Sequence, residues 1–361
     1  MSLISSLLMF RQCFAFVLAA LMALSLFFPF SATAQLRQIV VQTNSAGDNV
    51  HLIDPETNTI VGEISGVEVI HGVVASPDGT NLYLSNESTE MLDVVDVQTL
   101  KVTNSIPLSG RPNNVAIHND GHRAYVAIQG TGGGVDVIDL VNEEHVKFIR
   151  ILRGVHNTFM TPDSKYVVAG STGGGGATAI DTEFERARWT IYFEGRCDPC
   201  GVRPFTFDTN PDGSTKNMYV QVTNHHGFAV VDWDKREEIE RITQPEIPES
   251  ERNQYGIQGA PAHGIKVSPD GKTIWSTSKI NGHVYAYSLP ELEYLGGVPV
   301  GEVPDWLKFT QDGKYLYAAN AHSDTVSVID VETITEVKVI QVGQVPKRNI
   351  TAMLSAFPSG Q

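Results

Sequence analysis

The sequence predicts an all-β protein, a seven-bladed β-propeller with four antiparallel strands in each blade. Three observations predict it. One short pattern returns along the chain at intervals of roughly 40 residues, the length of one propeller blade. Each copy divides into four short strands, and the two ends of the chain carry complementary parts of one further copy. A closed ring of such blades leaves only short sheet edges exposed.

The most regular part of each copy is a first strand that ends in Asp-Gly or a close substitute. It is clearest in His71 to Gly79, and it returns in residues 113–121, 156–164, 203–213, 263–271 and 305–313. Asp-Gly favours a tight hairpin turn, because both residues accept the backbone conformations that such turns need.

Three further strands follow each first strand. In the last copy they are Tyr315 to Asn320, Val326 to Asp330 and Thr333 to Ile340. β-branched and aromatic residues that alternate with polar ones are typical of half-buried strands. Aspartates end most third strands and are expected to cap turns; they are Asp54, Asp96, Asp139, Asp181, Asp232 and Asp330.

The second strands resemble the tetrapeptide that names the YVTN family of propeller repeats. Tyr219 to Asn224 and Leu84 to Asn86 show it, and Ser-Pro-Asp-Gly and Val-x-Val-Ile-Asp segments accompany it over essentially the whole mature chain. The resemblance extends to the propeller superfamily that contains the β-chain of quinoprotein amine dehydrogenases. It implies the propeller fold and no particular function, since such propellers include enzymes, binding proteins and surface-layer components.

The two ends of the mature chain are expected to share the seventh blade. Residues 37–64 contain three strands without a first strand, and residues 345–354 contain a first strand with nothing after it. Pairing these segments would close the ring. Residues 35–361 are therefore predicted to form a single propeller domain.

Residues 1–34 have the features of a cleaved secretory signal peptide. Arg11 precedes the apolar run from Phe14 to Phe30, and an Ala-x-Ala site follows. The alternative is a retained membrane anchor, but Ser25 and Pro29 interrupt the run. No later stretch approaches the roughly 20 apolar residues of a spanning helix. The mature protein is expected in the periplasm or outside the cell, without a membrane span.

The composition is that of a folded, acidic protein. Hydrophobic residues make up 42% of the chain, charged residues 19%, and the formal net charge is −15. This balance argues against disorder. An acidic surface repels phosphate backbones, so nucleic acid is not expected as a partner.

Histidines gather at one end of the predicted channel. Because the first strand of each blade lines the channel, the residues that begin the first strands meet around one mouth. They are His71, Asn113, His156, Arg203, His263, Asp305 and Lys347. The second strands run back to the same mouth and end next to His225, His226 and His322.

This histidine set predicts a ligand or metal site. Neutral imidazole is the commonest metal ligand, and three histidines with one open position are typical of catalytic zinc. The expected ligands are His71, His156, His263 and His226, with zinc, copper or manganese as the metal. The alternative is a polar rim on which histidines bind nothing.

The other mouth residues form the candidate catalytic set. A histidine or Asp305 would take a proton, and Arg203 and Lys347 would hold an anionic group or stabilise a developing negative charge. His322 completes the set. Trp306 follows Asp305, where an exposed ring is expected to stack on a substrate, whereas Trp189, Trp233 and Trp275 are expected to pack between blades.

The mature chain keeps two cysteines, Cys197 and Cys200, in a long loop that opens at the same mouth. Export favours a structural disulfide between them. A redox-active dithiol and a metal pair are the alternatives. Gly201, not histidine, follows Cys200, so covalently bound haem is not expected. A second long loop, residues 246–262, opens beside it, and long loops on a rigid scaffold often carry binding sites.

Two classes of function remain open. The first is an exported, metal-assisted lyase, hydrolase or isomerase that acts on a small substrate, in one version an anionic one. The second is a non-catalytic binding or scaffold propeller that holds a ligand, a metal or a protein partner. The crowding of acidic, basic and imidazole groups at one mouth favours the enzyme.

Overall fold

The structure is a computed structural model that describes residues 36–130, 132–194, 200–255, 257 and 259–357. The predicted signal peptide lies outside these residues. The described chain contains seven four-stranded antiparallel sheets and one short 3-10 helix, η1 (Glu249–Glu251). Within it, no helix is long and apolar enough to cross a membrane.

Six blades follow one another along the chain, and the first three of them precede residue 193. One contains β4 (Ile70–Ala75), β5 (Asn81–Asn86), β6 (Met91–Asp96) and β7 (Lys101–Pro107). The next contains β8 (Pro112–Ile117), β9 (Arg123–Ile128), β10 (Gly134–Asp139) and β11 (Glu144–Arg150). The third contains β12 (Val155–Met160), β13 (Tyr166–Ser171), β14 (Gly176–Asp181) and β15 (Arg186–Tyr192).

The other three consecutive blades have the same strand order. The fourth contains β16 (Val202–Thr209), β17 (Thr215–Val222), β18 (Gly227–Asp232) and β19 (Glu237–Thr243). The fifth contains β20 (Ala262–Val267), β21 (Thr273–Ser278), β22 (His283–Ser288) and β23 (Tyr294–Pro299). The sixth contains β24 (Pro304–Phe309), β25 (Tyr315–Asn320), β26 (Thr325–Asp330) and β27 (Thr335–Gln341).

The remaining sheet joins the two ends of the propeller. Its order is β28-β1-β2-β3, from β28 (Pro346–Leu354), β1 (Arg37–Asn44), β2 (Asn49–Asp54) and β3 (Thr59–Ser65). β28 runs antiparallel to β1, with Arg37 opposite Leu354. The seven-bladed propeller and its closure by the chain ends are therefore confirmed.

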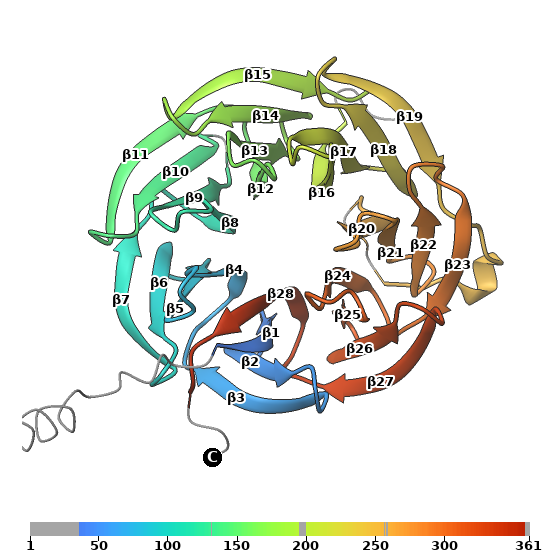
Figure 1. Ribbon diagram of the computed structural model, residues 1–361, viewed down its shortest axis with the longest axis horizontal. Coiled ribbons are helices and arrows are strands. Elements are labelled where there is room, and N and C mark those ends of the chain that lie inside the picture. The colour runs from blue at the N-terminus through green and yellow to red at the C-terminus, as the bar shows by residue number, and fades with distance from the viewer. Residues whose placement is uncertain (1–35, 131, 195–199, 256, 258, 358–361) are drawn as a thin grey trace, which may run out of the picture. The chain divides into compact units, whose positions relative to one another are not determined.

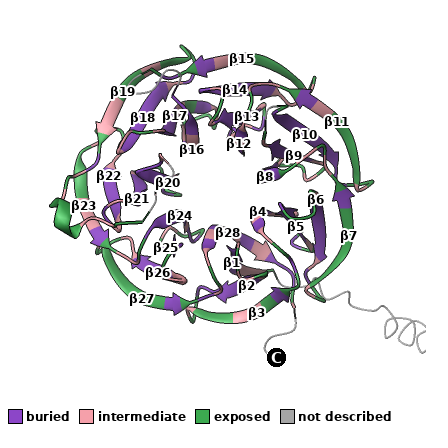
Figure 2. Ribbon diagram, turned by 180° about the vertical axis from the view of Figure 1, so that it is seen from behind, coloured by how far each residue is buried: buried purple, intermediate pink, exposed green. Residues whose placement is uncertain are grey.

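The blades stand around a central channel, with the first strand of each blade innermost (Figure 1). Burial follows this order, since the inner strands are mostly buried and the outermost strands mostly exposed (Figure 2). Apolar side chains of neighbouring blades pack against each other to form the core. Trp189 and Trp233 pack in one such cluster and Trp275 in another, which confirms their predicted structural role.

The predicted turn aspartates are confirmed. Each carboxylate accepts a hydrogen bond from a backbone N–H two or three residues ahead, as Asp96 does from Thr99 at 2.8 Å. The same contact occurs at Asp54, Asp139, Asp181, Asp232 and Asp330. These capped turns fix the connections between the third and fourth strands of the blades.

Candidate functional site

A β-bulge lies at the start of each first strand. In β4 the register passes from Ile70 opposite Asn86 to Gly72 opposite Ser85, so His71 is skipped. Equivalent irregularities occur at the starts of the other six inner strands. A bulge re-aims side chains at the edge of a sheet. The predicted mouth residues therefore fall outside the regular strand pairing at the point where each blade meets the channel.

Backbone strain accompanies three of these bulges. Val69, Val303 and Val345 have φ angles of 47°, 53° and 53°, in the left-handed region. β-branched residues rarely adopt this region, and each such residue costs about 1–3 kcal/mol. The three valines stand two positions before His71, Asp305 and Lys347. Strain of this kind is typical of functional sites, because the surrounding fold must hold the residue there.

Three of the predicted metal ligands meet across the mouth. The ring centroids of His71 and His156 are 6.0 Å apart, and those of His156 and His263 are 6.2 Å apart. Both pairs are close to perpendicular. The three rings come from β4, β12 and β20, which belong to alternate blades. We call the site around these three residues the histidine mouth.

Two of these rings donate from Nδ1 to neighbouring oxygens. His71 Nδ1 lies 2.6 Å from the Glu87 carboxylate. His263 Nδ1 lies 2.8 Å from the backbone carbonyl oxygen of Asp305. Since both partners are acceptors, each Nδ1 carries the proton in the neutral ring, and Nε2 is left with its lone pair.

The third ring has the opposite tautomer. Arg348 donates to the Asn157 side-chain oxygen at 3.0 Å, so the Asn157 amide group faces His156 Nδ1 at 2.8 Å and donates to it. His156 therefore carries its proton on Nε2. The mouth thus contains two imidazoles that can accept a proton and one that can donate a hydrogen bond.

Burial keeps the three imidazoles neutral. It lowers the pKa of His71, and it holds the pKa of His156 and His263 well below the ordinary 6.5. Burial also raises the pKa of Glu87, but His71 and Arg111 outweigh this effect and lower it to about 2. An ionised carboxylate next to a neutral imidazole is the arrangement of an oriented general base.

The predicted catalytic residues Asp305 and Lys347 lie at the histidine mouth. Lys279 donates to Asp305 Oδ1 at 2.7 Å, and Lys347 Nζ lies 3.7 Å from Asp305 Oδ2. Burial alone would raise the pKa of Asp305, but the interactions with His263, Lys279 and Lys347 outweigh it and hold the pKa well below its ordinary value. Asp305 therefore stays ionised and holds the cations in place.

Arg203 belongs to the same charge cluster. Burial lowers the pKa of this guanidinium, and the charge of Asp305 opposes that shift. The structure therefore brings Arg203 together with the other predicted mouth residues. Its position on β16 places a positive charge in the blade between those of His156 and His263.

Arg348 was not predicted, although it is central to the site. Its guanidinium donates to the side-chain oxygens of Asn113 and Asn157, on two other inner strands. Burial lowers its pKa to about 9, with Asp305 and Glu87 opposing that shift, so it stays charged near neutral pH. Arg348 follows Lys347 directly, and a basic pair at the start of the last inner strand was the available signal.

The prediction of an exposed Trp306 ring is wrong. The residue is only 9% exposed. The Arg348 guanidinium lies 4.3 Å from the ring centroid, and the Phe159 ring lies nearly parallel to it at 6.1 Å. The two neighbours cover the indole, so it is not available to stack on a substrate. The cation of Arg348 is instead stabilised by this aromatic face.

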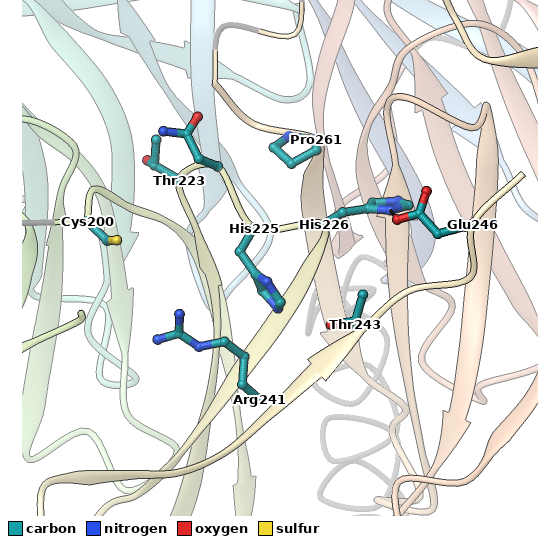
Figure 3. A pocket seen from close by; sticks show the side chains of 9 residues that line it. Cys200, Thr223, His225, His226, Arg241, Thr243, Glu246 and Pro261 are labelled. Atoms are coloured by element: carbon teal, nitrogen blue, oxygen red, sulfur yellow. Dashed lines mark ion pairs between the residues drawn. The ribbon is translucent and has the colours of Figure 1, made fainter. Parts of the chain in front are cut away.

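His226 lies away from the three channel histidines, in a side pocket. In the described chain, it has no ring contact or hydrogen bond with them; its Nε2 lies 2.7 Å from the Ser278 hydroxyl. The pocket has a volume of about 390 Å³ and also includes Cys200 and Arg241. Figure 3 shows the His226 ring beside the Glu246 carboxylate. Burial lowers the pKa of His226 to about 4.

His322 is also separate from the three histidines. Its ring stacks on Tyr255 of the long loop before β20, with centroids 4.2 Å apart and an interplanar angle of 28°. This contact ties the loop to the rim of the sixth blade. The structure therefore gives His322 a packing contact, and no contact with the other predicted catalytic residues in the described chain.

In the described part of the chain, the side chains form no preformed metal centre. Within the described residues, no group of three or more histidine, cysteine, aspartate or glutamate side chains is arranged to hold a metal ion. The Nδ1 atoms of the three mouth histidines are engaged, so a metal would have to use Nε2. Cys200 is buried. Cys197 lies outside the described residues, and the disulfide stays a prediction.

Fold and site together define a seven-bladed propeller with an imidazole-rich channel mouth. A family profile described as "Lactonase, 7-bladed beta-propeller" matches residues 152–339, just over half of the chain. The chain therefore belongs to this family of seven-bladed lactonase propellers. The resemblance to YVTN repeats and to quinoprotein propellers stays a prediction.

Known relatives agree with this fold. Over 117 residues the chain is 28% identical to the seven-bladed β-propeller protein Rv1057 of Mycobacterium tuberculosis, a match that covers 31% of this chain and only 30% of that protein. Two solved structures share the fold over 88% of this chain. A candidate 6-phosphogluconolactonase of Bacteroides uniformis has a TM-score of 0.71 at 20% identity over 100% of its length. The periplasmic gluconolactonase PpgL of Pseudomonas aeruginosa has 0.69 at 16% identity over 99%.

Proposed function

We propose that this protein is a hydrolase that opens the ring ester of a small lactone at the histidine mouth. The observation that carries the proposal is the pair of His71 and Glu87, an ionised buried carboxylate that holds a neutral imidazole with its Nε2 lone pair unused. Membership in the lactonase family favours hydrolysis over a lyase or isomerase reaction.

The chemistry follows from the tautomers. His71 Nε2 takes a proton from a water molecule as the water oxygen attacks the lactone carbonyl carbon, and Glu87 stabilises the imidazolium that forms. The carbonyl oxygen becomes an oxyanion, which accepts a hydrogen bond from His156 Nε2–H and faces the Arg203 guanidinium. When the ring C–O bond breaks, His71 returns its proton to the departing alkoxide. The product is a hydroxy acid, released as its carboxylate.

The charges at the mouth indicate the substrate class. Arg203, Lys279, Lys347 and Arg348 outnumber the ionised Asp305 and Glu87 in a protein whose formal net charge is −15. A local excess of positive charge favours an anionic lactone and stabilises the carboxylate product. Sugar lactones fit this description, and the gluconolactonase names of two structural neighbours support them. The predicted signal peptide supports a reaction in the periplasm or outside the cell.

Metal assistance is a second version of this proposal. A zinc, copper or manganese ion on the Nε2 atoms of His71 and His263 would polarise the lactone carbonyl. His156 would join as the third ligand only with its ring proton removed from Nε2. Elemental analysis of the purified protein tests it. Near-stoichiometric metal that is lost in His71→Ala, His156→Ala and His263→Ala, and kept in His283→Ala, would establish the metal-assisted version. Protein that stays metal-free after reconstitution would overturn it.

Lactone hydrolysis is tested by measuring acid release in a pH-stat at pH 7. The substrates are glucono-1,5-lactone, its 6-phospho ester and lactones of uronic acids. The parent protein is expected to exceed the spontaneous rate for at least one of them, with saturation. Rates equal to the spontaneous rate for all of them would contradict the proposal. The binding or scaffold propeller would then be the better account.

A further inference from the structure

The far end of the channel contains a second cavity, distinct from the histidine mouth. It has a volume of about 420 Å³ and is lined by the distal halves of the inner strands. Because each inner strand crosses the channel, residues three positions after the mouth residues form a deeper ring. Members of that ring that line the cavity include Val74, Ala116, Phe159, Lys266, Lys308 and Ile350. We call this space the lysine cavity.

Two cations lie close together in this ring, and neither has a counterion among the described residues. Lys266 and Lys308 occupy equivalent positions on β20 and β24, which lie in neighbouring blades. Neither ammonium group forms a hydrogen bond or ion pair within the part of the chain that the structure describes. Both lysines are partly buried, and a charge that loses part of its hydration without gaining a partner is costly to keep.

The carboxylates that share a pocket with Lys266 do not pair with it. Asp208 and Asp270 line an adjoining pocket that Lys266 also borders. Asp208 accepts a hydrogen bond from Tyr219 at 3.0 Å, and Asp270 pairs with the exposed Lys272 at 3.6 Å. Repulsion by Lys308, followed by burial, lowers the pKa of Lys266 to about 7. Two repelling, unpaired ammonium groups make this wall of the cavity a place for an anion.

Much of the rest of the cavity is apolar and aromatic, although Asn114, Thr206, Arg348 and Asn349 also line it. Phe159, Phe205 and Phe207 line it, together with Trp306 and Met160. The ring of Phe159 lies 4.8 Å from that of Phe205, edge to face. A flat apolar body would pack among such rings, while its charged group would have to lie toward the lysines. The lining thus suits a molecule with one anionic end and one aromatic body.

A polar partition separates this cavity from the histidine mouth. Arg348 and Trp306 border the lysine cavity, and the Arg348 guanidinium is held by Asn113 and Asn157 on the side of the histidines. The lysine cavity and the histidine mouth therefore differ in the side chains that line them, and they adjoin at Arg348 and Trp306. A ligand of the lysine cavity would not need the reactive imidazoles.

We propose that the lysine cavity is a second ligand site that binds a small aromatic carboxylate, with its carboxylate on Lys266 and Lys308 and its ring among the phenylalanines. The proposal does not depend on lactone hydrolysis. Its failure would leave the proposed function untouched, and the reverse also holds.

The test is isothermal titration calorimetry of the purified protein at pH 6.5 with benzoate. The parent is expected to bind benzoate with one site. Benzamide, which has the same ring without the charge, and acetate, which has the charge without the ring, should each bind at least tenfold more weakly. Lys266→Met/Lys308→Met should weaken benzoate at least tenfold, whereas Lys272→Met, a matched exposed lysine, should bind as the parent does.

Folding of the double variant is checked by thermal unfolding without ligand. Removing two repelling ammonium groups from an apolar ring should raise the Tm above that of the parent, whereas lysines with a merely structural role would lower it. The proposal is overturned if the parent binds no benzoate at millimolar concentration or if benzamide binds equally well. It is also overturned if binding survives in the double variant and is lost in Arg203→Met, because the benzoate would then occupy the histidine mouth.

Discussion

The two ends of one channel differ in how their charges are held. At the histidine mouth, Asp305 and Glu87 pair with neighbouring cations and imidazoles, and each ring nitrogen Nδ1 has a partner. At the lysine cavity, Lys266 and Lys308 have no partner within the described chain. Both ends are built from equivalent positions of the same seven strands.

This difference indicates a separate role for each end. A connected polar network fixes tautomers and charges before a substrate arrives, which is what chemistry on a bound molecule needs. The unpaired cations beside the apolar wall of the lysine cavity have no fixed partner until an anion binds to them. We therefore expect reaction at the first end and binding at the second.

Removing the last strand is expected to have the largest effect, because it would disrupt the histidine mouth and the lysine cavity together. Deletion of Asn349 to Gln361 removes most of β28, which pairs with β1 and closes the ring. The exposed edges of the open ring and the lost interblade core should abolish cooperative unfolding. Urea titration followed by circular dichroism checks this. Val339→Ser, at an exposed position on β27, serves as the control and should unfold as the parent does. A truncated protein with an unchanged midpoint would contradict closure by β28.

Replacing the shared partition should affect both ends, but less severely. Arg348→Met removes the donor that orients Asn157, and with it the tautomer of His156. We expect kcat/KM for lactone hydrolysis to fall about 10- to 100-fold, and benzoate affinity to fall a few-fold. Arg150→Met, at an exposed position on β11, is the matched control and should change neither. Loss at one end alone would show that Arg348 does not join the two sites.

The pH dependence of the free energy of unfolding should distinguish the two ends. It is expected to be smaller than the effects of the strand deletion and of the Arg348 substitution. The mouth histidines have lowered pKa values when folded, so the unfolded chain binds protons more readily, and stability falls as pH drops below about 6.5. Lys266 titrates at about 7 when folded and at 10.5 as a free side chain, so stability should rise with pH between these values.

Urea unfolding over a pH series measures both slopes. His71→Asn/His156→Asn/His263→Asn should flatten the acidic slope and leave the alkaline one, and Lys266→Met should do the reverse. If either set of substitutions changed both slopes equally, the two ends would not be electrostatically independent. The sign of each slope follows from the direction of the pKa shift alone.

The sequence predicted the strands and the mouth residues well, because repeat period and turn chemistry are local signals. It also predicted that His71, Arg203 and Lys347 share a mouth, since equivalent repeat positions are equivalent in space. Glu87 and Arg348 escaped prediction because each stands one residue beyond a position that the repeats align. The bulge at the start of each inner strand determines which of two neighbouring side chains points into the channel. No local sequence pattern marks these bulges.

Other features depend on contacts between distant segments. Trp306 follows a mouth residue and was expected to be exposed, yet Arg348 from another strand covers it. His226 belongs to the same rim in sequence, but its ring turns toward Ser278 of the next blade. The unpaired state of Lys266 and Lys308 appears only when every neighbouring side chain is placed. The repeat pattern does not predict which side chains of different blades contact each other.

The most direct test of the account compares the two ends in one assay. Lactone hydrolysis is measured for the parent and for His71→Asn, Lys266→Met and His283→Asn, with the best substrate of the lactone series. The account predicts a kcat/KM lower by about 10²–10⁴ in His71→Asn, as expected for loss of a general base, and values near the parent in the other two. Full activity in His71→Asn, or loss in Lys266→Met instead, would contradict the assignment of the chemistry to the histidine mouth.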